Sequence, residues 1–177
     1  MIISAPYRSG GTSLAIKLAA DHGLIFAGQI DNNSVAETRL EDKNKVHEYD
    51  NQPDHTINDI VKILIDDSGH VVLNNSNPAL FSRTTHFIIR RDMSRVYSSM
   101  YWLMSKFYPN MGVWTVDMMF KRITFFNALL LSHLKETNTI PFILEDQQWY
   151  KPTPEHEIPK EFSDLISKYT SYLEEFK

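Results

Sequence analysis

The residues best suited to chemistry form one short run directly after an apolar segment at the N-terminus. The run reads Arg8, Ser9, Gly10, Gly11, Thr12 and Ser13. Glycine lets backbone approach a ligand closely, and the first amides of a helix point into one concavity together with the positive end of the helix dipole. Hydroxyl groups and one guanidinium add further donors. The run predicts a phosphate-binding turn between a strand and a helix, although a plain strand-turn-helix junction would use the same glycines.

The turn departs from the phosphate loop of ATP and GTP hydrolases, which reads G-x-x-x-x-G-K-[S/T]. Gly10 and Thr12 align with the second glycine and the hydroxyl of that pattern, but Gly11 stands at the lysine position. Arg8 is therefore the only cation in the loop. A later apolar run ends in Asn74, where metal-dependent nucleotide enzymes commonly carry an aspartate that helps to hold magnesium. These features predict phosphate binding without a metal.

A second candidate lies where another apolar run meets a predicted helix. Arg91 stands at the end of the run, and Ser99 follows two helical turns later. The planar fork of arginine and a serine hydroxyl together suit a phosphate group. The sequence thus predicts two anion-binding points.

The two runs together resemble the sulfotransferase family, which uses 3′-phosphoadenosine 5′-phosphosulfate and has a P-loop-type fold. The family's first loop reads roughly P-[K/R]-S-G-T-[T/S], and residues 8–12 are similar to it without a gap. Its second motif reads roughly R-[D/N]-P-x-[D/R]-x-x-x-S, and residues 91–99 keep that spacing, with Met93 at the proline position. The style of the motifs is closest to tyrosylprotein-type and glycan-type members.

The resemblance implies a role for each residue of the two motifs. The 5′ end of the sulfuryl donor would be held by Arg8, Ser9, Gly10, Gly11, Thr12 and Ser13. Arg91 and Ser99 would hold its 3′-phosphate, and Arg8 would also stabilise charge on the transferring group, with no metal required. The acceptor would be a hydroxyl or amine of a small molecule, glycan or peptide.

Sulfuryl transfer also requires a base for the acceptor proton. Tyrosylprotein-type and glycan-type members use a glutamate after the second strand, and the stretch Ala-Glu-Thr-Arg at 36–39 resembles theirs, so Glu37 is the expected catalytic base. Asp31 and Glu41 are alternatives, and Glu37 and Glu41 equally suit the solvated face of a short helix. The histidine base of soluble small-molecule members and the C-terminal R-K-G-type loop are both missing.

The rest of the chain predicts the elements that position these residues. Short apolar runs predict strands at 1–5, 24–27, 70–74, 85–90 and 139–144. Helices are expected at 12–22, 56–67, 94–107, 113–137 and 160–176, with a short one around 36–47. This alternation predicts an α/β fold, a three-layer domain of P-loop type with a mostly parallel sheet of about five strands flanked by helices. The aromatic and methionine-rich segment 97–120 is expected in the core, or else lining an apolar acceptor pocket.

Composition narrows the classes of protein that remain. The 177 residues suit a single domain over 1–177, and a net charge of −4 argues against general nucleic-acid binding. The lack of cysteine, of a leader segment and of a membrane-spanning apolar run predicts a cytoplasmic protein that does not enter a membrane. The oligomeric state is left open. Two other functions remain: a metal-dependent P-loop kinase for nucleotides or small molecules, and a non-catalytic nucleotide-binding domain.

Overall fold

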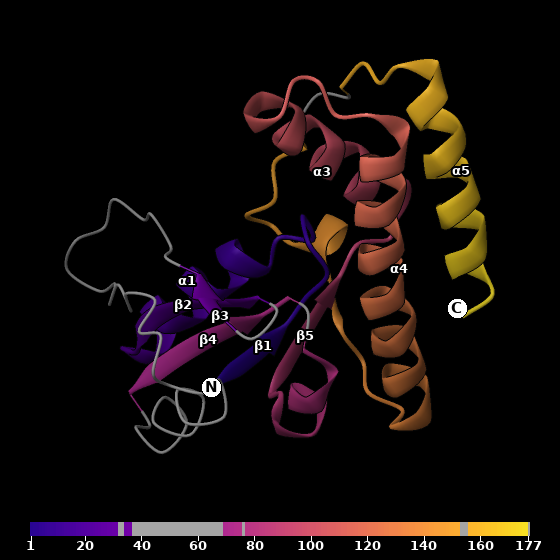
Figure 1. The fold of residues 1–177 in the computed structure, drawn as a ribbon. Coiled ribbons are helices and arrows are strands. Elements are labelled where there is room, and N and C mark those ends of the chain that lie inside the picture. The colour runs from indigo at the N-terminus through magenta and orange to yellow at the C-terminus, as the bar shows by residue number, and fades with distance from the viewer. Residues whose placement is uncertain (32–33, 37–68, 76, 153–155, 177) are drawn as a thin grey trace. The chain divides into compact units, whose positions relative to one another are not determined.

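The computed structural model describes residues 1–31, 34–36, 69–75, 77–152 and 156–176 (Figure 1). The chain forms two compact units that interleave along the sequence. The first unit combines Met1–Ala5 with Gly10–Ile88, and the second combines Pro6–Ser9 with Ile89–Lys177. Arg8 and Ser9 therefore belong to the second unit, and residues 10–13 belong to the first.

The first unit contains a mostly parallel sheet with the strand order β3-β2-β4-β1-β5. Its strands are β1 Ile2–Ser4, β2 Ile25–Asp31, β3 Ser34–Ala36, β4 His70–Asn74 and β5 His86–Ile89. β1 pairs in parallel with β4 and β5, and β2 pairs in parallel with β4, whereas β3 runs antiparallel to β2. The predicted α/β fold class, with a mostly parallel sheet of about five strands, is confirmed.

Helix α1, Gly11–His22, packs on this sheet through one buried apolar face. The face consists of Leu14, Ala15, Leu18 and Ala19. Gly23 ends the helix in the left-handed conformation, at φ 66°, where its amide donates to the carbonyls at the end of the helix. The predicted boundary at Gly23 is confirmed, because the stop signal is local to the sequence.

Gly11 is fixed by the packing of α1 against the sheet. A Cβ atom at this position would lie 2.7 Å from Ala5 Cβ and 2.7 Å from Leu73 Cδ1. A side chain on residue 11 would therefore be directed into the sheet. This explains why the loop carries no lysine at the position where nucleotide hydrolases have one.

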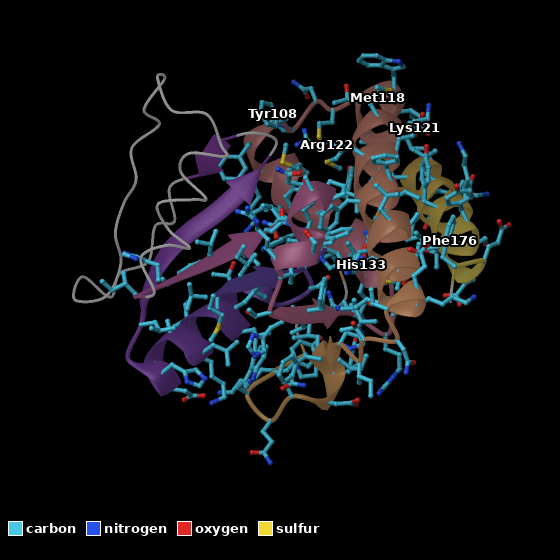
Figure 2. All side chains as sticks on the ribbon, turned by 90° about the horizontal axis from the view of Figure 1, so that it is seen from below. Tyr108, Met118, Lys121, Arg122, His133 and Phe176 are labelled. Atoms are coloured by element: carbon cyan, nitrogen blue, oxygen red, sulfur yellow. The ribbon has the colours of Figure 1, made fainter. Side chains whose placement is uncertain are left out.

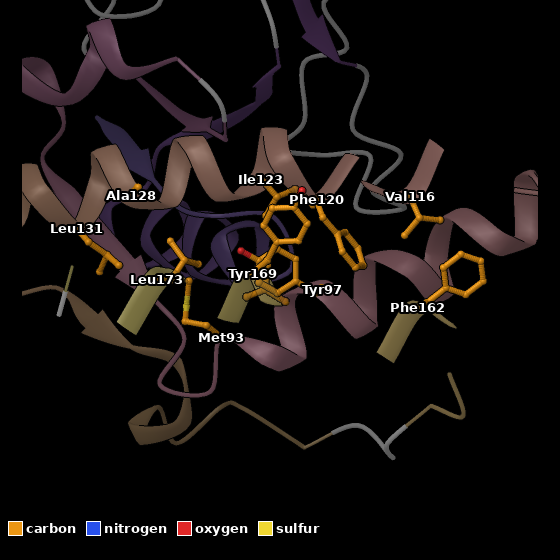
Figure 3. Packing of buried hydrophobic residues seen from close by; sticks show 11 residues of the cluster. Met93, Tyr97, Val116, Phe120, Ile123, Ala128, Leu131, Phe162, Tyr169 and Leu173 are labelled. Atoms are coloured by element: carbon orange, nitrogen blue, oxygen red, sulfur yellow. The ribbon is translucent and has the colours of Figure 1, made fainter. Parts of the chain in front are cut away.

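The second unit contains three helices: α3 Ser94–Phe107, α4 Val113–Glu136 and α5 Lys160–Glu174. Their apolar faces share a buried cluster, shown in Figure 3, in which the rings of Tyr97 and Phe120 lie 4.9 Å apart. Tyr97 is fully buried, and its hydroxyl pairs with Thr124 Oγ1 at 2.7 Å. Burial raises the pKa of Tyr97 to about 12. None of the helices in the described part of the chain is long and apolar enough to cross a membrane.

Two strand predictions differ from the structure. The strand expected at 139–144 is reduced to β6, Phe142–Ile143, followed by a 3₁₀ turn at Leu144–Asp146. Residues 139–141 follow the turn that ends α4 and form no strand: Asn138 turns to φ 49°, and the Thr139 amide donates to the Leu134 carbonyl of the helix. Strand β3 falls in a segment that gave no strand signal. The helix predicted at 56–67 and most of the one around 36–47 lie outside the described residues.

We predict that Gly11→Ala destabilises the fold by about 1–3 kcal/mol, since the added methyl group overpacks the junction of α1 with the sheet. The matched control is Gly112→Ala, because a Cβ at Gly112 meets no atom within 4 Å and Gly112 has φ −80°. The control should change the free energy of unfolding by less than about 0.5 kcal/mol. Urea unfolding of both variants measures the difference, and equal stabilities would contradict the packing explanation.

Candidate functional site

The two sequence motifs meet at the side chain of Arg8. Its Nε atom donates a hydrogen bond to Ser99 Oγ at 3.0 Å, across 91 positions of sequence. Ser99 lies in the second turn of α3, and both residues belong to the second unit. The structure therefore brings together the cation of the first predicted anion site and the hydroxyl of the second.

The backbone of Arg8 is held in an unusual conformation. Its φ of 61° lies in the left-handed region, which costs a non-glycine residue roughly 1–2 kcal/mol. The Arg8 carbonyl accepts a hydrogen bond from Arg90 Nη1 at 3.3 Å. Burial, and after it the positive charge of Arg90, lowers the pKa of Arg8. The fold thus holds two guanidinium groups close together at a strained loop.

Ser9 is fully buried in this loop. Its amide donates to the Pro6 carbonyl at 3.3 Å, but its hydroxyl has no hydrogen-bond partner among the described residues. A buried hydroxyl without a partner costs roughly 1–3 kcal/mol, and such groups often mark a place where a ligand binds. Ser9 is therefore suited to donate to a bound anion.

The remaining residues of the predicted loop lie at the start of α1. Gly10 precedes the helix at φ 79°, and Gly11 is its first residue. Thr12 is half-buried and Ser13 is exposed. The first amides of a helix have no acceptor within the helix, so they remain available to an anion. The predicted turn and helix start are present, and phosphate binding by them stays a prediction.

Arg90 and Arg91 differ sharply in their surroundings. Arg90 is 5% exposed and donates from Nη2 to the Tyr150 hydroxyl at 2.8 Å, with Glu145 Oε1 3.5 Å from its Nε. The side chain of Arg91 is 64% exposed and pairs with Asp146 Oδ1 at 2.7 Å. Arg90, to which the sequence analysis assigned no role, is therefore the buried arginine of the pair, and Arg91 is the exposed one.

A pocket of about 280 Å³ lies beside the N-terminal half of α3. Its polar lining comes from two arginines, one carboxylate, one histidine and four serines: Arg90, Arg95, Asp92, His156, Ser94, Ser98, Ser99 and Ser163. Arg91 is not part of this lining, so the structure does not bring together the predicted pair of Arg91 and Ser99. The lining is rich in cationic and hydroxyl donors, which suits a phosphate oxygen.

Among the lining residues, the sequence analysis assigned a binding role only to Ser99; Arg95 and His156 are two that it missed. Arg95 precedes Ser99 by one helical turn, and this i, i+4 spacing places both on one helix face, a signal that was available. His156 left no local signal. Its ring stacks on Trp102 with centroids 4.1 Å apart and planes 5° apart, and Lys106 Nζ lies 3.4 Å from the centroid of the Trp102 ring.

The structure does not describe the side chains of the three candidate bases. Glu37 and Glu41 lie outside the described residues, and Asp31 is described only as the last residue of β2. Asn74 is buried and engaged within the fold, because its amide bonds to Ser4 Oγ at 3.0 Å and to the Asn77 carbonyl at 2.9 Å. In the described part of the chain, no three His, Asp or Glu side chains cluster as metal ligands do.

The aromatic and methionine-rich segment 97–120 is partly buried in the core and partly exposed. Tyr97 and Phe120 are buried in the core, whereas Phe107 is 68% and Trp114 76% exposed. The core prediction is therefore wrong for the middle of the segment. An apolar pocket of about 620 Å³ lies there, at the turn between α3 and α4. Tyr108, which is labelled in Figure 2, is one of its lining residues.

No model of a known protein family matches the chain, and no curated protein matches it.

Proposed function

We propose that this protein is a sulfotransferase that uses 3′-phosphoadenosine 5′-phosphosulfate and acts on a hydroxyl or amine. One observation carries the proposal: the 3.0 Å hydrogen bond from Arg8 to Ser99. The resemblance assigns these residues to opposite ends of one donor molecule, and a donor with two anionic ends needs both sets of ligands within its own length. A chance match of two unrelated loops would give no reason for their side chains to touch.

The residues present fit such a donor. The buried hydroxyl of Ser9 has no partner among the described residues, and the chain runs from Ser9 directly into the glycines and the first turn of α1. Amides, hydroxyls and guanidinium groups supply the positive field that a phosphosulfate requires. The loop residues 8–13 are proposed to hold the 5′ end, and Ser99 to bind the 3′-phosphate. Arg91, to which the resemblance gives that phosphate as well, faces Asp146 instead.

The chain's own residues divide the chemistry between them. The bound donor supplies an activated sulfuryl group whose leaving group is adenosine 3′,5′-bisphosphate. The guanidinium of Arg8 stabilises negative charge at the 5′ end, where its backbone is already held in place. Glu37, the proposed base, takes the proton that the acceptor oxygen or nitrogen loses. The acceptor is proposed to be a small molecule, a glycan or a peptide.

Adenosine 3′,5′-bisphosphate should stabilise the protein in the absence of magnesium, because all proposed ligands are protein donors. At a hundred times the dissociation constant, the gain is ~2.7 kcal/mol, or roughly 5–10 °C in melting temperature for a chain of this size. Thermal melting with this ligand and with ATP, each with and without magnesium, makes the measurement. A shift that appears only with ATP and magnesium would replace this proposal with a metal-dependent kinase.

Arg8→Ala should lower the rate of sulfuryl transfer by ~10² to 10³, since it removes a preorganised cation from the developing charge. Arg8→Lys should recover part of the rate, because the charge returns without the planar fork. Binding of the bisphosphate, measured by calorimetry, should fall much less than the rate, since the loop amides remain. Full activity in Arg8→Ala would exclude Arg8 from the mechanism.

Glu37→Gln should lower turnover by ~10² to 10⁴ while leaving the affinity for the bisphosphate unchanged, since the amide keeps the shape but not the basic oxygen. Asp31→Asn and Glu41→Gln are the matched comparisons. Steady-state rates and calorimetry on all three variants separate the candidates. If only one of the other two variants loses turnover, that residue is the base; if none does, none of the three carboxylates is the base. Nucleotide binding with no turnover in the wild type itself would favour a non-catalytic nucleotide-binding domain.

A further inference from the structure

Three arginines surround the start of α3, and they differ in what holds them. Arg90 is buried, and its hydrogen bonds go to carbonyls and to the Tyr150 hydroxyl. Arg91 is exposed and paired with Asp146 at 2.7 Å. Arg95 is half-buried and is one of the residues that line the pocket, as is Ser99. Of the three arginines, Arg95 is the one that lines the pocket and also keeps part of its side chain exposed.

We propose that this pocket binds the 3′-phosphate of the donor, and that Arg95 is its guanidinium ligand in place of Arg91. The assignment rests on the proposed sulfotransferase function and changes which arginine recognises the phosphate. Arg95 and Ser99 stand four residues apart in α3, so they share one helix face. Arg91 would have to break its ion pair with Asp146 and turn from solvent to reach the same point.

The hydroxyl of Ser99 has the hydrogen-bonding capacity that the proposal requires. A serine hydroxyl has one donor and two acceptor lone pairs. Ser99 Oγ accepts from Arg8 Nε at 3.0 Å, which leaves its own hydrogen to donate to a phosphate oxygen. Ser98 is different, because its hydroxyl donates to the Ser94 carbonyl at 3.0 Å. Ser99 is therefore the better donor of the two serines.

Asp92 supplies the carboxylate of the pocket lining, and it accepts hydrogen bonds from the first residue of α3. Asp92 Oδ1 accepts from the Ser94 amide at 3.0 Å and from the Ser94 hydroxyl at 2.6 Å. Its other oxygen lies 3.7 Å from Arg95 Nε, a long contact for an ion pair. A phosphate dianion is a stronger partner for the Arg95 fork than this distant carboxylate.

The size and the lining of the pocket suit one end of a nucleotide. Its volume of about 280 Å³ is just below the ~300–1,000 Å³ range of sites for whole small molecules, so it fits a phosphate on a sugar rather than the complete donor. The lining also includes His156, stacked on Trp102 of α3, and Ser163 in the first turn of α5. These residues add donors from a segment far along the chain.

The test is calorimetric titration of wild type and variants with three ligands: adenosine 3′,5′-bisphosphate, 3′-AMP and 5′-AMP. Arg95→Ala should weaken the first two by about ten- to a hundredfold and leave 5′-AMP within about twofold, because only the first two carry a 3′-phosphate. Arg95→Lys should recover part of the loss. Arg91→Ala should weaken the same ligands less than Arg95→Ala does.

Arg122→Ala, on the exposed face of α4, is the control for loss of an arginine as such. Melting of each free variant establishes that it is folded, and Arg95→Gln, which keeps the side-chain stem, replaces Arg95→Ala if the latter is not. The inference is overturned if Arg91→Ala has the larger effect, if all three ligands weaken equally, or if wild type binds neither 3′-phosphate ligand. Arg95-dependent binding of 3′-AMP without any sulfuryl transfer would leave it standing and remove only the proposed function.

Discussion

The buried charge of Arg90 constrains the whole candidate site. A guanidinium removed from water must be compensated by hydrogen bonds and opposite charge, and breaking such a set leaves an uncompensated charge that is strongly destabilising. Arg90 finds its partners in the carbonyls of Arg8 and Arg95, in the Tyr150 hydroxyl and in Glu145. These groups come from three separate segments of the second unit. One buried charge thereby fixes the loop, the first turn of α3 and the acidic turn after β6.

The same hydrogen bonds hold two positively charged residues, Arg8 and Arg90, close together. Burial, and after it the nearby charge of Arg90, lowers the pKa of Arg8, and the Arg8 backbone is held at φ 61°. Strained backbone and clustered charge of one sign persist only where the surrounding structure enforces them, and they concentrate at functional sites. A bound dianion would relieve the repulsion. The energetics of the loop therefore agree with a binding role, independently of the resemblance in sequence.

Much of the fold could be predicted because its signals are local. The bounds of α3 follow from apolar periodicity alone, and α1 ends at Gly23 because only a residue that tolerates positive φ suits that stop. β3 and the shortened β6 could not be predicted in this way. β3 exists through its pairing with β2, and at the start of the expected last strand the Thr139 amide bonds back to the Leu134 carbonyl of α4. Such competition between neighbouring elements is settled by tertiary contacts.

The sequence by itself determined that Arg8, Ser9 and the two glycines form a turn before a helix, and that Ser99 lies inside another helix. It did not determine which arginine accompanies Ser99. Arg90 and Arg91 are adjacent and chemically identical, and only their environments separate a buried side chain from one that is 64% exposed. The contact of Arg8 with Ser99 spans 91 positions, and that of His156 with Trp102 is also distant in sequence. Side-chain direction and long-range contact arise only when the chain packs, so the tertiary structure alone decided the composition of the pocket.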